Sequence, residues 1–222
     1  MRASVYGIAI LLSLSLSFPF CPSKAANSPS GTKKAGSHAP PPPFDEHAFK
    51  RVLPTVLKTL ATGFSLGSFV GRFEVTPLGA IREALGKGTI QHQGDAAGSL
   101  YWLCYTYGQQ RLWVVSGEMS GPDHRVTEII EELTEKDALA SADCDIIPKK
   151  FSPVVFDSNL RLGMSRHEVT RALGPPSQSD SAQIVYARAA TTADSFDETA
   201  WIILRFIEDK LVFMRGGKIT TN

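Results

Sequence analysis

The chain has 222 residues, of which 43% are hydrophobic and 20% charged, and its 23 basic and 22 acidic side chains leave a formal net charge of +1. This balance excludes the basic field that nucleic-acid binding requires, and no block of like charges favours an acidic polymer or a membrane surface as partner. No histidine pair at metal-ligand spacing accompanies the cysteines, so neither a metal nor another cofactor is expected.

Residues 1–25 have the pattern of a secretory signal peptide. Arg2 provides a basic start, residues 8–18 form an apolar stretch too short to span a bilayer comfortably, and small residues flank Lys24 at the end. Cleavage there removes two bases and no acid, which leaves the mature chain with a net charge near −1. The sequence therefore predicts a periplasmic or secreted protein.

Two alternatives to cleavage remain open. An N-terminal membrane anchor is disfavoured because serines interrupt the apolar stretch and Pro19 and Pro22 follow it. Lipid attachment at Cys21 is disfavoured because residues 18–20 are Phe-Pro-Phe, where a lipoprotein signal needs small residues.

Residues 26–43 consist of small, polar and proline residues without a large apolar side chain. Such a segment is typical of a disordered tether, and its final proline run favours the polyproline II conformation. The alternative is that this run is itself a proline motif that a partner domain recognises.

The first structural unit is expected at residues 44–135. Apolar residues at helical spacing over 44–60 predict one helix kinked at Pro54, or two short ones. A second helix is expected to begin at Pro77, with Thr76 as its cap, and to end at Gly86. Four strands are expected to follow, at residues 89–93, 100–107, 111–119 and 125–130.

A connector is expected at residues 136–152 and a second unit at 153–222. Ser165 and Glu168 have the spacing of a capping box, and Gly174, followed by two prolines, ends the helix that they begin. Strands are expected at residues 183–188, 200–207 and 210–215, with a possible fourth at 218–222.

The two helices superimpose at their Leu-Gly ends, which indicates an internal repeat. We therefore predict an α+β protein of two tandem units, each with helices packed on one face of a short antiparallel sheet. A unit of about seventy residues has a marginal core of its own, so the two are expected to pack together.

Cys104 and Cys144 are the cysteines that remain after cleavage. Outside the cytoplasm an isolated pair of this kind favours a disulfide. The bridge would hold the connector against a strand of the first sheet.

A family resemblance rests on several features of the second unit. They are the motif Leu162-Gly163-Met164-Ser165, with Glu168-Val169 and Leu173-Gly174 after it, a strand that begins at Trp201 and a closing strand over 210–213. They resemble the repeat of the β-lactamase inhibitor protein family and of the small lipoprotein of the outer-membrane barrel assembly machine. The resemblance implies helices on an antiparallel sheet, a curved sheet surface that grips a protein partner, and no enzymatic activity. The missing lipobox argues against the lipoprotein.

Residues 63–67, Gly-Phe-Ser-Leu-Gly, match the nucleophile elbow of serine hydrolases. Ser65 is the candidate nucleophile of that reading, with His92, His124 and His167 as bases by order alone. The elbow requires a strand before the serine, and here a helical pattern precedes it, so a glycine-rich connection is the favoured interpretation and no catalytic residue is assigned.

Aromatic residues mark the strands of the first sheet. Tyr101, Tyr105 and Tyr107 fall on one face of a strand, with Trp102 and Cys104 on the other, and Trp113 lies in the next strand. The three tyrosines and Trp113 are the candidate binding residues, because tyrosine and tryptophan dominate protein-binding hot spots; the alternative is that they pack in the core or between units.

The sequence therefore predicts an exported, non-enzymatic protein-binding module of the bacterial cell envelope. An inhibitor of a secreted or periplasmic hydrolase is the first alternative, and a serine hydrolase that uses Ser65 is the lesser one. The identity of the protein partner is not predicted.

Overall fold

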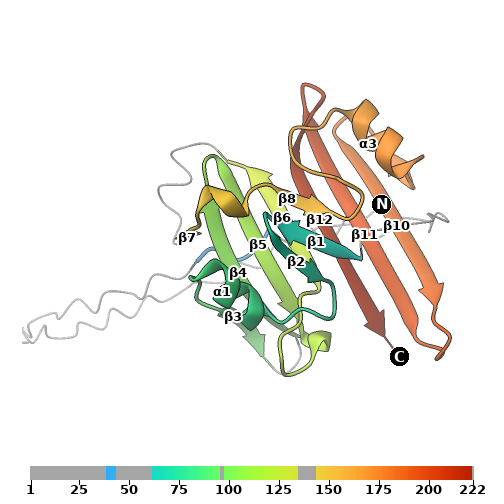
Figure 1. Cartoon of the computed structure of the whole chain (residues 1–222). Coiled ribbons are helices and arrows are strands. Elements are labelled where there is room, and N and C mark those ends of the chain that lie inside the picture. Colours follow the sequence, from blue (N-terminus) through green and yellow to red (C-terminus); the bar gives the residue numbers. More distant parts are fainter. Residues whose placement is uncertain (1–38, 44–61, 96–97, 135–143, 222) are drawn as a thin grey trace, which may run out of the picture. The chain divides into compact units, whose positions relative to one another are not determined.

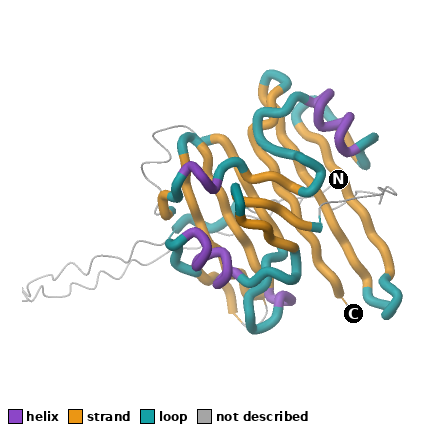
Figure 2. The backbone as a smooth tube through the Cα atoms, in the orientation of Figure 1, coloured by secondary structure: helices purple, strands orange, loops and turns teal. Residues whose placement is uncertain are grey.

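The computed structural model describes residues 39–43, 62–95, 98–134 and 144–221. The expected signal peptide, most of the tether and the helix expected over 44–60 lie outside these residues. Among the described residues no helix is both long enough and apolar enough to cross a bilayer. Strands dominate them (Figures 1 and 2).

The largest element is a sheet of nine strands. Eight of them form one continuous row in which each strand runs antiparallel to its neighbours. A ninth strand, β7, pairs with β4 in parallel. In spatial order the eight strands of the row are β3 (Gln91–Asp95), β4 (Gly98–Tyr107), β5 (Gln110–Gly117), β6 (Glu128–Leu133), β12 (Lys210–Thr221), β11 (Asp197–Ile207), β10 (Gln183–Thr191) and β9 (Gln178–Ser179). The ninth strand, β7, is Asp145–Ile146.

The prediction of an α+β protein with two separate sheets is wrong. The last strand of the first half, β6, pairs directly with β12, with Phe213 opposite Glu132 and Gly217 opposite Glu128. Both halves therefore share one sheet, and the described chain is mostly β with two short helices. The strand expected at 218–222 is the continuation of β12.

Two glycines in β12 allow close packing on both faces of the sheet. A Cβ atom at Gly216 would lie 2.8 Å from the ring of Phe156, and one at Gly217 would lie 2.5 Å from the ring of Trp201. Because real Cβ atoms do not approach other atoms so closely, the aromatic rings can lie directly over the strand only where no side chain projects.

A second sheet of three strands lies on one face of the large sheet (Figure 1). It contains β1 (Gly63–Leu66), β2 (Phe69–Arg72) and β8 (Val154–Phe156), in the order β2-β1-β8. None of these three strands was expected from the sequence. Phe64, Leu66, Val154 and Phe156 of this sheet are at most 1% exposed and belong to the same core as the inner face of the large sheet.

Both helices end as predicted, and the second also begins as predicted, but the cap expected for the first is absent. In α3 (Arg166–Leu173) the Ser165 hydroxyl accepts from the Glu168 amide and the Glu168 carboxylate accepts from the Ser165 amide, which confirms the capping box. In α1 (Leu78–Leu85) Gly86 forms the left-handed C-cap, whereas the Thr76 hydroxyl accepts from the Arg72 amide and does not cap the helix. Two short 3-10 turns, η2 (Glu118–Ser120) and η3 (Lys149–Phe151), complete the elements.

The core face of the large sheet carries one buried acid. Glu131 is 0% exposed, and its Oε1 accepts from the Tyr107 hydroxyl. Burial raises the pKa of the Glu131 carboxyl well above its ordinary value of 4.5, although the Val154 amide lowers that pKa in part. Glu131 therefore keeps its proton to a higher pH than an exposed glutamate does.

This raised pKa predicts that the protein loses stability as the pH rises above about 4.5. Below that pH both the folded and the unfolded chain hold the proton; above it only the folded chain does, so stability falls by about 1.4 kcal/mol per pH unit until the folded pKa is reached. Glu131→Gln keeps the shape and removes the titration, so its unfolding free energy in urea should change less between pH 5 and pH 8. Equal slopes for the two proteins would contradict this assignment.

Candidate functional site

The face of the large sheet that is turned away from the core carries a second apolar cluster, here called the tryptophan face. Its residues come from four adjacent strands and are each at most 7% exposed. They are Trp102 and Cys104 of β4, Trp113 and Val115 of β5, Ile130 of β6 and Phe213 of β12.

Strand register brings these side chains together. The two-residue turn after Tyr107 pairs Cys104 with Trp113, and Trp113 in turn faces Ile130 on β6. Since side chains alternate between the two faces of a strand, Trp102 lies on the same face as Cys104 and next to Trp113 on the diagonal.

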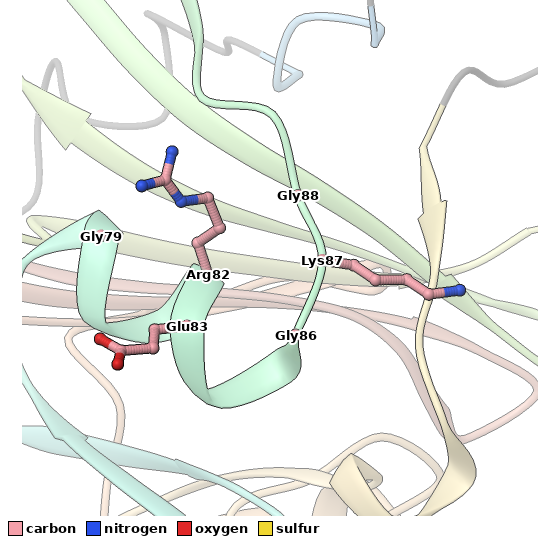
Figure 3. Close-up of a pocket in the computed structure, with 6 residues that line it drawn as sticks. All are labelled: Gly79, Arg82, Glu83, Gly86, Lys87 and Gly88. Carbon is pink, nitrogen blue, oxygen red and sulfur yellow. The ribbon is translucent and has the colours of Figure 1, made fainter.

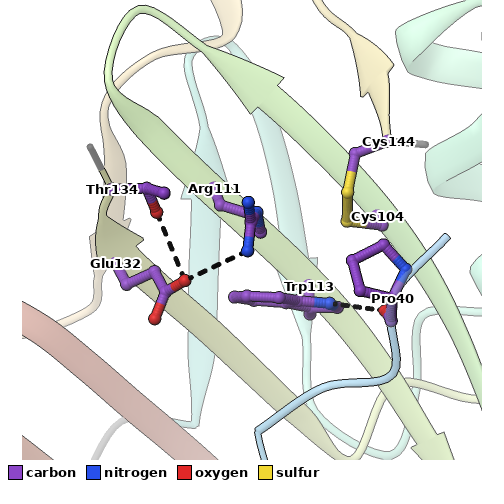
Figure 4. Close-up of a disulfide and its surroundings, with 7 residues drawn as sticks. All are labelled: Pro40, Cys104, Arg111, Trp113, Glu132, Thr134 and Cys144. Atoms are coloured by element: carbon purple, nitrogen blue, oxygen red, sulfur yellow. Dashed lines mark hydrogen bonds and ion pairs between the residues drawn. A yellow bond between two sulfur atoms is a disulfide. The ribbon is translucent and has the colours of Figure 1, made fainter. Parts of the chain in front are cut away.

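A segment from far upstream in the chain lies on this face. Residues 39–43, Ala-Pro-Pro-Pro-Pro, are the last five of the predicted tether, and Ala39, at 5% exposed, belongs to the apolar cluster of the face. The indole Nε1 of Trp113 donates a hydrogen bond of 3.0 Å to the Pro40 carbonyl (Figure 4). The tryptophan face therefore already binds an extended stretch of polypeptide.

Charged and polar side chains lie along one side of the tryptophan face. The Arg111 guanidinium lies 5.4 Å from the centre of the Trp113 ring and 3.6 Å from Oε1 of Glu132, which also accepts from the Thr134 hydroxyl (Figure 4). The planar guanidinium thus extends the aromatic surface with a positive charge.

A buried ion pair lies on the same side of the sheet. Arg215 Nε donates to Glu128 Oε1 at 2.5 Å, and Trp201 Nε1 donates to the same oxygen at 3.0 Å. Burial raises the pKa of the Glu128 carboxyl, while the Arg215 guanidinium lowers that pKa in part. The pair joins β6 to β12, the two strands that connect the halves of the sheet.

One donor on the tryptophan face has no acceptor. Trp102 is 4% exposed, and its Nε1 has no hydrogen-bond partner within the described residues. A buried N–H group without an acceptor costs about 1–3 kcal/mol. A ligand that offered a carbonyl oxygen here would remove that cost.

The predicted disulfide is confirmed. Cys104 and Cys144 are bonded, with their Cα atoms 4.8 Å apart, and β7 begins immediately after Cys144 (Figure 4). Residues 136–143 of the expected connector lie outside the described residues.

The structure does not place the four candidate binding residues on one face. Trp113 lies on the tryptophan face, whereas the tyrosines point to the core side: Tyr105 is 0% exposed and its hydroxyl donates to the Lys87 carbonyl, and Tyr107 donates to Glu131. Whether these four residues bind a partner stays a prediction. Sequence reasoning missed Trp102 as their neighbour, although the two-residue turn between β4 and β5 would have placed it beside Trp113.

Two histidines unexpectedly flank Tyr101. The ring of His92 stacks on it at 4.4 Å between centroids and that of His124 at 3.8 Å. This stack uses both imidazoles as packing surfaces. His167 lies exposed on α3.

Ser65 does not have the geometry of a nucleophile elbow. It lies within β1, paired with Val70 on one side and Val155 on the other, and the chain continues into an antiparallel strand instead of a helix. In the part of the chain that the structure describes, no group of three or more His, Cys, Asp or Glu side chains could hold a metal ion.

An open hollow of about 640 Å³ lies beside the C-terminal end of α1. Its charged lining residues, Arg82, Glu83 and Lys87, point in different directions and do not converge on one point (Figure 3). The hollow therefore lacks the convergent polar groups that fix a small ligand.

No protein-family model and no curated protein matches the chain. A solved structure from Streptococcus mutans, described as a "putative beta-lactamase inhibitor protein", matches 70% of this chain and 85% of its own, with 10% sequence identity and a TM-score of 0.24. That description names one of the two families that the sequence resembles; none of the comparisons supports the lipoprotein. These values are too low to establish a shared fold or function.

Proposed function

We propose that the protein is an exported, non-enzymatic protein-binding module of the bacterial cell envelope, and that its partner binds on the tryptophan face. The observation that supports this most directly is the Pro40 carbonyl bound to Trp113, because it shows an extended polypeptide segment held on this face. Export is supported by the disulfide, which forms and persists outside a reducing cytoplasm.

The composition of the tryptophan face fits protein recognition. Tryptophan and arginine are the residues most enriched in hot spots, and here Trp102, Trp113 and Arg111 are neighbours, held by strands and a disulfide. A rigid surface of this kind loses little side-chain freedom on binding, which favours affinity.

We predict that immobilised protein, residues 26–222, retains a partner from envelope or secreted fractions and that Trp113→Ala weakens this retention. Removing a hot-spot aromatic typically costs about 2 kcal/mol of binding or more, close to a thirtyfold loss of affinity. Val70→Ser is the matched control, because Val70 is 75% exposed on β2 of the three-stranded sheet. Circular dichroism and an intact disulfide verify that both variants fold.

Equal retention by all three baits would contradict binding on the tryptophan face. An inhibitor of a secreted or periplasmic hydrolase is the second candidate, and the same experiment separates it. A retained hydrolase would lose its activity in the complex, whereas a partner of another kind would have no activity to lose.

A further inference from the structure

We propose that the tryptophan face is a recognition site for proline-rich, extended segments of a partner protein, and that the chain's own Ala39–Pro43 run occupies this site as an internal competitor. This inference rests on the proposed function and names the chemistry of its partner. Three observations carry it: the identity of the bound segment, the hydrogen bond that holds it, and the donor left unused.

The bound segment is itself a short polyproline run. Each of Pro40, Pro41, Pro42 and Pro43 fixes its own φ near −65°, the value of polyproline II, so the segment loses little conformational freedom when it binds. Proline has no backbone N–H, and a polyproline II helix has no internal hydrogen bonds, so such a segment offers carbonyl oxygens only. A site that recognises it must supply donors on an apolar surface.

The tryptophan face supplies that combination. Trp113 presents a flat ring and donates its indole N–H to the Pro40 carbonyl at 3.0 Å (Figure 4). Arg111 lies against the same ring at 5.4 Å, and Cys104, which the disulfide fixes, lies directly opposite Trp113 on β4. Aromatic grooves with an indole donor are a recurring solution for binding proline-rich peptides.

The second donor has the correct spacing for the same kind of ligand. Trp102 and Trp113 are diagonal neighbours on adjacent strands, about 7–8 Å apart at the backbone. Equivalent carbonyls of a polyproline II helix recur every three residues, or about 9 Å, a distance that two indole side chains can match. The internal segment bonds Trp113 and leaves Nε1 of Trp102 without a partner, so a longer proline-rich ligand can satisfy a donor that Ala39–Pro43 does not.

The test uses the chain 26–222 with Pro40→Gly, Pro41→Ser, Pro42→Gly and Pro43→Ser, here called the released variant, which keeps the chain length. Binding of a fluorescein-labelled peptide with the sequence of residues 36–43, GSHAPPPP, is followed by fluorescence anisotropy. We expect the peptide to bind the released variant and to bind the parent at least roughly tenfold more weakly, because a tethered competitor acts at a millimolar effective concentration.

Two substitutions in the released variant separate recognition from folding. Trp113→Phe and Trp102→Phe each keep an aromatic ring and remove one N–H donor. Trp113→Phe should weaken the peptide GSHAPPPP by roughly three- to tenfold, the effect of one hydrogen bond. Trp102→Phe should weaken by a similar factor a longer peptide that continues with further prolines, whose additional carbonyl oxygens can reach the Trp102 donor. In the parent, Trp102→Phe should leave thermal stability unchanged or raise it, since its Nε1 has no acceptor there. Peptide affinity that is insensitive to both substitutions would overturn the assignment of these donors.

Three other outcomes would overturn the proposal. The first is that the natively folded released variant does not bind the peptide. The second is that a control peptide with alanine at all four proline positions binds equally well. The third is that the parent forms a dimer that disappears when the four prolines are replaced, which would make a second copy of the chain the occupant. Retention of a partner that the proline peptide does not displace would refute this inference while leaving the proposed function intact.

Discussion

Replacing Arg215 by alanine is expected to lower the free energy of unfolding by about 3–5 kcal/mol, the cost of breaking a buried ion pair by removing one partner. Glu128 is 4% exposed and Arg215 is 6% exposed, and their 2.5 Å contact spans the junction between β6 and β12. Without the guanidinium, the Trp201 N–H still donates to the Glu128 carboxylate, but the buried negative charge has lost its cation. Urea denaturation at neutral pH measures the loss.

The double variant Glu128→Met/Arg215→Met is expected to be much less destabilised than Arg215→Ala, because well-packed apolar residues avoid the cost of removing two charges from water. Arg125→Ala is the matched control, since Arg125 and Asp123 form an exposed pair with side chains 51% and 63% accessible, and its loss should cost less than about 1 kcal/mol. A double variant that unfolds as easily as Arg215→Ala would contradict this explanation.

Local signals in the sequence predicted the ends of α1 and α3 and the approximate positions of seven strands. The capping box at Ser165 and the left-handed glycine at residue 86 are decided by residues close together in the chain, so they can be read without knowing the fold. Alternation along β4 also separated its tyrosines from Trp102 and Cys104 correctly.

The pairing of β6 with β12 could not be read in the same way. Strand alternation shows which residues share a face of a strand, but it does not show which strands pair with each other at their edges. The sequence feature that bears on this junction is the Gly216–Gly217 pair, which leaves room for the rings of Phe156 and Trp201. The sequence does not show that these two rings lie over the glycines, so the glycines did not indicate that the strand is central in a larger sheet. Two separate sheets were therefore the simpler interpretation.

The three-stranded sheet was missed for a different reason. Its strands have only three or four residues, and β1 and β2 carry glycines that weaken any strand pattern. Gly71 nevertheless has a role, because a Cβ atom there would lie 2.4 Å from the ring of Phe64. The identity of the candidate site depended on similar long-range information, because nothing in residues 26–43 indicates that Pro40 accepts a hydrogen bond from Trp113.

Removing the disulfide with Cys104→Ala/Cys144→Ala is expected to lower the free energy of unfolding by about 4 kcal/mol. The two cysteines are 40 residues apart in sequence, and the chain-entropy estimate assigns about this value to a loop of that length. The comparison is made by urea denaturation of the oxidised parent and the double variant.

Reduction of the parent supplies an independent measure of the same effect. If the bridge acts mainly by restricting the unfolded chain, the reduced parent and Cys144→Ala should lose as much stability as the double variant, because all three lack the cross-link. A much smaller loss in the reduced parent would mean that replacing the buried Cys104 side chain damages the packing of the tryptophan face. Since Cys104 lies opposite Trp113 in that cluster, the released variant in its reduced form would then show whether the bridge also positions the indole that holds the proline segment.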